Sequence, residues 1–151
     1  MSNHENYLRL RIHAAPDTTE VRAQISEALS ELDLEPDESN TPSSLTGDFT
    51  GYFGDQDAVL ALAKALTGLP GLAFELWTEE EQGEPGLIVT HASGVGTFTG
   101  GCDRGGEVVV PETVVRRIAL EEDPAERTRL LEEVTGCAVR AALHPGAEQQ
   151  G

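Results

Sequence analysis

Histidine and cysteine are the side chains of this sequence that could serve as a base, a nucleophile or a metal ligand. No H-x-x-x-H or H-E-x-x-H pattern occurs, and the two cysteines fit no metal-binding knuckle. The sequence therefore predicts no metal site and no cofactor. The residues concerned are His4, His13, His91, His144, Cys102 and Cys137.

One histidine and one cysteine could still act together. Cys102 ends one predicted strand and His91 ends the strand before it, so a thiol and an imidazole could meet as nucleophile and base. A small enzyme, or a metal-dependent hydrolase, would then have a site assembled at long range around His91 and Cys102. Two reduced thiols without a catalytic role are the alternative.

Glycine-rich and alternating acidic patterns predict no nucleotide or calcium site. Gly94, Gly96, Gly100 and Gly101 do not form G-x-G-x-x-G, and no Walker-type G-x-x-x-x-G-K-[ST] is present. Residues 33–37 alternate acids, but Pro36 interrupts them and the remainder of a calcium loop does not follow.

Carboxylates dominate the charge of the chain. Its 151 residues carry 27 acids and 10 bases, a formal net charge of −17. This balance argues against direct nucleic-acid binding and against docking on an anionic membrane. Three clusters hold many of the acids: Glu31, Asp33, Glu35, Asp37 and Glu38; Glu79, Glu80, Glu81 and Glu84; and Glu121, Glu122 and Asp123.

Two interpretations of the clusters compete. They are a solvated or salt-adapted surface, or they steer a basic protein partner into place. Charge sets the rate and orientation of association more than its strength, so an apolar anchor is also needed. Trp77, beside the second cluster, is the predicted anchor.

The sequence thus predicts a non-enzymatic acidic binding protein. We expect an inhibitor, immunity-type or nucleic-acid-mimicking protein that occludes the basic surface of a toxin, a nuclease or a nucleic-acid-binding enzyme. A structural or oligomerising domain with a solvent-adapted surface is a further alternative, and the oligomeric state stays open. The first residues lack the pattern of a secretory signal, which favours a cytoplasmic location.

Alternation and helical periodicity predict the elements that position these residues. Residues 7–13 alternate as a half-buried strand, and Asp17 with Glu20 forms a predicted capping box before a helix with apolar residues at 21, 25, 29 and 32. Residues 34–46 are a predicted loop. A strand at 48–53, a helix at 55–66 and a strand at 72–77 follow, giving β-α-β-α-β.

The sequence after residue 77 predicts a β-meander followed by helices. Strands are expected at 87–91, 95–99 and 107–110, the second ending at Gly100-Gly101. Pro111 opens one helix, Asp123-Pro124 opens another and Gly136 ends it. The fold class is α+β, with a mixed or antiparallel sheet that is ferredoxin-like or a relative with helices on one face. We expect one domain over residues 1–143 and a flexible tail over 144–151.

Overall fold

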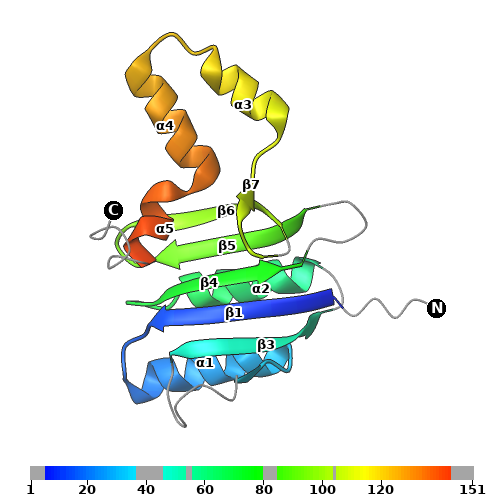
Figure 1. Ribbon diagram of the computed structural model, residues 1–151. Coiled ribbons are helices and arrows are strands. Elements are labelled where there is room, and N and C mark those ends of the chain that lie inside the picture. The colour runs from blue at the N-terminus through cyan, green and yellow to red at the C-terminus, as the bar shows by residue number, and fades with distance from the viewer. Residues whose placement is uncertain (1–5, 37–45, 54–55, 80–84, 104, 144–151) are drawn as a thin grey trace, which may run out of the picture.

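A computed structural model describes residues 6–36, 46–53, 56–79, 85–103 and 105–143. These form seven strands in one antiparallel sheet and five helices (Figure 1). The strands are β1 (Asn6–Ala14), β2 (Glu35–Pro36), β3 (Gly47–Phe53), β4 (Ala73–Thr78), β5 (Gly86–Ala92), β6 (Gly96–Cys102) and β7 (Val108–Val109). The helices are α1 (Thr19–Glu31), α2 (Gln56–Thr67), α3 (Glu112–Ala119), α4 (Pro124–Thr135) and α5 (Cys137–Leu143).

The strand order is β2-β3-β1-β4-β5-β6-β7, and the first half is ferredoxin-like. The elements β1-α1-β2-β3-α2-β4 in the order β2-β3-β1-β4 are the β-α-β-β-α-β arrangement of that topology. The sequence predicted this α+β class, but it missed β2. Residues 34–46 were expected to be loop throughout, whereas Glu35 and Pro36 pair with Thr50 and Phe49 of β3.

One face of the sheet is covered by α1 and α2. Because side chains alternate along a strand, the predicted apolar face of β1 points to these helices and its polar face points away. Leu8, Leu10 and Ile12 are at most 1% exposed, and they pack with Phe74 and with Ile25 of α1 in the larger core cluster. We call the opposite side the open face, because α1 and α2 do not cover it.

The C-terminal helices pack on the open face over β5 and β6. Val139 and Leu143 of α5 are buried with Ile88, Phe98 and Cys102 in a second core cluster. In Figure 1, α5 lies in front of β5 and β6, whereas α1 and α2 lie behind the sheet. The predicted meander β4-β5-β6-β7 is confirmed, although β6 runs through both glycines to Cys102 and does not end at Gly100.

The caps of α4 lie where the sequence predicts them, whereas the N-cap of α1 is shifted by one residue. Asp123 accepts from the N–H of Ala125 at 3.1 Å as the N-cap of α4, and Gly136 ends α4 in the left-handed region at φ 65°. The predicted capping box on α1 is wrong by one residue. Thr18 is the N-cap and accepts from the N–H of Val21, while Asp17 pairs with Arg22 at 2.6 Å.

Candidate partner-binding site

The described residues of two predicted acidic clusters lie toward the same end of the sheet. Glu35 is paired with Thr50, Thr50 with Arg9, and Arg9 with Trp77, so these residues share one level across four strands. Asp33 lies two residues before Glu35, and Glu79 lies two residues after Trp77. Because β2 and β4 run in opposite directions, both acids fall beyond this level on the same side.

The sheet register therefore brings Asp33 and Glu79, which are more than forty residues apart in the sequence, to the same end of the sheet. Glu35 and Trp77, the nearest ladder positions, are three strand spacings apart, about 14 Å. Glu31 ends α1 at this same end of the molecule (Figure 1). Asp37, Glu38, Glu80, Glu81 and Glu84 lie outside the described residues. The third cluster, Glu121 to Asp123, lies away from the others at the turn between α3 and α4.

A groove between α1 and α2 adjoins this acidic end. Its volume is about 410 Å³, within the range of pockets that bind ligands. Alanines from α2 and leucines form an apolar floor, and polar side chains of α1 stand along one rim. The lining residues are Gln24, Glu27, Ala28, Glu31, Leu32, Ala58, Ala61, Leu62, Ala65 and Leu69.

Glu27 and Glu31 lie at positions in α1 where their negative charges destabilise the helix. Glu27 and Glu31 are four residues apart on one helix face, which brings two like charges together. Glu31 also lies in the last turn, which has no basic residue, and negative charge there opposes the helix dipole. Asp33 follows with φ at 51°, a conformation uncommon for a residue with a side chain. The stability of the fold alone therefore does not favour these residues at positions 27, 31 and 33.

Trp77 is not part of this groove. Its side chain lies on the open face, because it pairs with Arg9 and Ile88 in neighbouring strands. The β6–β7 turn covers it, and a Cβ added at Gly106 would lie 3.0 Å from the indole Nε1. Trp77 is half-buried against the second core cluster. The apolar surface beside the acidic residues is therefore the floor of the α1–α2 groove and not Trp77.

The open face over β3, β1 and β4 is polar, and its charges are paired internally. Arg11 binds Asp48 at 2.6 Å, and the hydrogen bond from this guanidinium to Asp48 raises the pKa of Arg11. His13 contacts Glu75 at 2.7 Å. The guanidinium carbon of Arg9 lies 5.2 Å from the ring centre of Tyr7, as in a cation–π contact. This face lacks the excess of carboxylates found beside the groove.

The structure does not bring His91 and Cys102 together. His91 pairs with Thr97 and Cys102 with Gly86, so they are five residues apart along the ladder, about 17 Å. They also point to opposite faces of the sheet. The Cys102 thiol is buried and donates to the carbonyl oxygens of Thr78 and Leu87. His91 shares a hydrogen bond of 2.7 Å with Thr97 Oγ1, and partial burial lowers the pKa of His91.

The described residues also bear on metal binding and on membrane insertion. Within these ranges, no three His, Cys, Asp or Glu side chains are grouped so that they could hold a metal ion. No helix in the described part of the chain has the length and apolar character needed to cross a membrane.

Fold and surface together define an acidic α+β protein in which a ferredoxin-like unit carries an apolar groove with a carboxylate rim. Residues 12–148 match the family described as "Protein of unknown function (DUF3145)", and the chain belongs to that family. No curated protein and no solved structure matches the chain.

The groove is the feature that sequence reasoning missed. Ala58, Ala61 and Ala65 recur at helical spacing on α2, which is the only signal of its floor in the sequence. Alanine is common on helix surfaces, so this spacing by itself does not distinguish a groove from ordinary solvent exposure.

Proposed function

We propose that this protein is a non-enzymatic binding protein that holds a basic amphipathic helix of a protein partner in the α1–α2 groove. The observation that carries the proposal is the combination of an apolar floor with the carboxylates of Glu27 and Glu31 on its rim. A helix that binds in a groove places its apolar side chains on the floor at spacings of three and four residues. Lysine or arginine beside that stripe would meet the rim.

The acidic end of the sheet adds steering to this contact. Asp33 and Glu35 follow the end of α1, and Glu79 lies toward the same end of the sheet, so these acids extend the negative surface beyond the groove itself. Such a field speeds the approach of a basic partner and orients it, and salt weakens both effects. The biological form that we propose is occlusion: the partner is a toxin, a nuclease or a nucleic-acid-binding enzyme whose phosphate-binding surface the protein covers.

Site-specific photocross-linking tests the groove directly. A photoreactive amino acid is placed at Ala61 on the groove floor, and at Ala142 on α5 as the matched control; both positions are exposed alanines on helices. We expect the Ala61 probe to capture, in extract of the source cells, a peptide rich in lysine or arginine with helical apolar spacing. The yield should fall several-fold when salt is raised. Equal capture from both positions, or a captured peptide without this pattern, contradicts the proposal.

Charge variants separate the rim from the general acidity of the chain. Replacing Glu27 and Glu31 by glutamine removes two charges beside the groove, whereas replacing Glu122 and Glu132 removes one charge from the α3–α4 turn and one from α4. At low salt we expect the first variant to slow association with the captured partner about three- to tenfold. The second should have a smaller effect, and equal effects would show that only net charge matters.

A further inference from the structure

Helices α3 and α4 form a hairpin that projects from the sheet and has little core of its own (Figure 1). Helix α4 contains no buried residue, and α3 buries only Ile118, which belongs to neither core cluster. An amphipathic helix normally buries its apolar face against a partner element. These two helices leave much of theirs in solvent.

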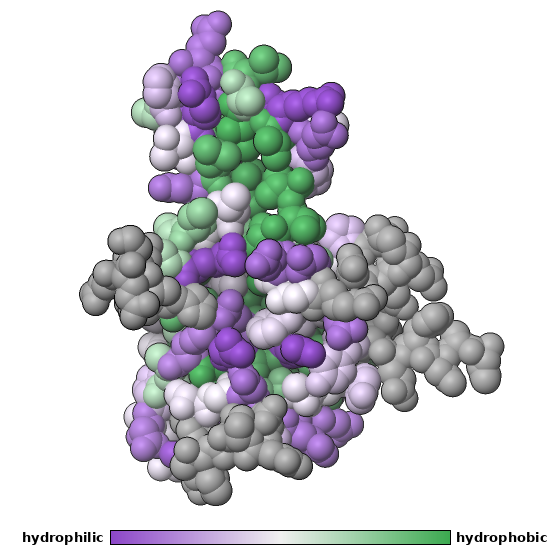
Figure 2. Space-filling view, viewed as in Figure 1, coloured by the Kyte–Doolittle hydropathy of each residue, from purple (hydrophilic) through white to green (hydrophobic). Residues whose placement is uncertain are grey.

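Three large apolar side chains of the hairpin are exposed. Leu120 is 81% exposed, Val115 46% and Leu131 44%. Figure 2 shows a hydrophobic surface over α3 and α4 with hydrophilic residues on both of its sides. A contiguous apolar surface of this kind, with a polar border, is typical of a protein–protein contact.

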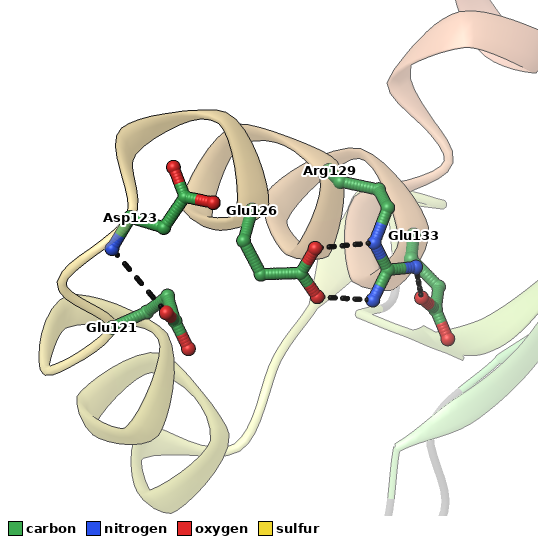
Figure 3. A network of polar contacts seen from close by, with 5 residues as sticks. All are labelled: Glu121, Asp123, Glu126, Arg129 and Glu133. Carbon is green, nitrogen blue, oxygen red and sulfur yellow. Dashed lines mark hydrogen bonds and ion pairs between the residues drawn. The ribbon is translucent and has the colours of Figure 1, made fainter.

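Polar contacts stabilise α4 and the turn that precedes it. Arg129 binds Glu126 through two nitrogens, at 2.6 and 3.0 Å, and Glu133 at 2.9 Å (Figure 3). The Arg127 guanidinium donates twice to the carbonyl oxygen of Glu121 at the turn. The Arg127 contact therefore ties α4 to the turn that joins it to α3.

We infer that this face is a self-association surface, on which the α3–α4 hairpin of a second copy docks to give a four-helix bundle. The charge pattern favours a copy over a foreign partner. Residues 111–135 hold seven acids and four arginines. In the described part of the chain, Arg117, Glu122 and Glu132 make no ion pair, so both signs of charge are free to pair across a two-fold axis.

The position of the hairpin also reduces the repulsion between two copies of a chain with net charge −17. Because the hairpin projects from the sheet, contact through it keeps the acidic ends of the two sheets apart. Helix α4 alone is about 18 Å long, more than twice the Debye length of about 8 Å at physiological salt. Contact through the α1–α2 side would instead bring like charges together.

The size of the face sets the expected affinity. Two helices of about 10 Å diameter and up to about 18 Å length offer about 360 Å² per copy. That is about half of a standard interface, so we expect a dissociation constant in the micromolar range or weaker. This surface and its role are independent of the partner groove proposed above.

Sedimentation of the full chain over roughly 1 µM to 1 mM tests the inference. We expect a monomer–dimer equilibrium that strengthens as salt rises, because screening of the repulsion between two chains of net charge −17 outweighs screening of the few ion pairs across the axis, and salt does not weaken apolar contact. Leu120→Asp and Leu131→Asp should each raise the dissociation constant at least tenfold. Leu60→Asp is the matched control, since Leu60 lies on α2 and is 41% exposed.

Circular dichroism confirms that each variant keeps the helix content of the wild type. A monomer at every concentration overturns the inference, and so does a Leu60→Asp variant that loses association as fully as Leu120→Asp. Association that weakens with salt and depends on Glu27 and Glu31 would place the contact on the groove side and also overturn it. None of these results decides whether the Ala61 probe captures a basic peptide, so the two proposals fail separately.

Discussion

Replacing Gly136 by alanine tests how the C-terminal helices are attached to the sheet. Gly136 is buried at the end of α4 with φ at 65°, and an added Cβ would lie 2.3 Å from Cγ of Phe98 and 2.6 Å from Cδ2. Phe98 is 7% exposed in the second core cluster. The substitution therefore combines a left-handed alanine with a clash that the ring can relieve only by leaving its place.

The magnitude follows from these two parts. The left-handed conformation costs about 1–2 kcal/mol for a residue with a Cβ, and overpacking of a filled core costs about 1–3 kcal/mol more. Gly94→Ala is the matched control, because Gly94 also has positive φ, at 84°, but nothing lies within 4 Å of its added Cβ. The difference between the two variants isolates the contact with Phe98.

Thermal unfolding followed by circular dichroism measures this difference. For a chain of this length about 1 kcal/mol corresponds to about 2–4 °C, so Gly136→Ala should melt about 3–10 °C below Gly94→Ala. A Phe98→Ala background should remove most of this gap, since the clash is then absent. If both glycine variants melt together in the wild-type background, α4 does not pack on Phe98 as described.

Three further predictions concern stability. Glu31→Lys should stabilise the fold by about 1 kcal/mol at low salt, because it removes repulsion from Glu27 and complements the helix dipole; urea denaturation should show the gain shrinking as salt rises. Thr18→Ala should cost about 1 kcal/mol through loss of the α1 N-cap, whereas Asp17→Ala should cost less; equal losses in thermal melts would contradict the cap assignment. Because burial lowers the pKa of His91, the unfolded chain binds a proton there more readily, so this residue favours unfolding below about pH 6.5 and has no such effect above it. Urea melts at about pH 7.5 and 5.5 should show a larger acid loss for the wild type than for His91→Gln, and an equal loss would contradict the buried placement.

The strands and helices were predictable wherever one local signal dominated. Alternation of Leu8, Leu10 and Ile12 identified β1, and Asp123-Pro124 marked the start of α4. By contrast, β2 is two residues long and contains a proline, so no periodicity could reveal it. Its existence depends on the edge of β3, which is a partner distant in sequence.

The candidate site was predictable in composition but not in position. The acids near residues 31–35 and near residue 79 were evident as runs, but only the sheet register places Asp33 and Glu79 at one end. Trp77 was selected for its residue type, and the structure places it half-buried on the open face beside the β6–β7 turn. His91 and Cys102 show the same limit, because a shift of one residue along a strand reverses the face to which a side chain points.

Binding of a partner in the groove and self-association through the hairpin should be weakly coupled, and each should favour the other. A basic helix bound in the groove would neutralise part of the net charge of −17 and so reduce the repulsion between copies. Binding of the partner must then favour association through Leu120 and Leu131, and association must favour the partner by the same factor, since coupling free energies are reciprocal. Because the surfaces are separated by more than a Debye length, we expect a factor of about two to five at low salt and none at about 0.5 M. Sedimentation with and without a saturating basic helical peptide measures this factor, and a dimer that weakens when the peptide binds would mean that the two surfaces compete.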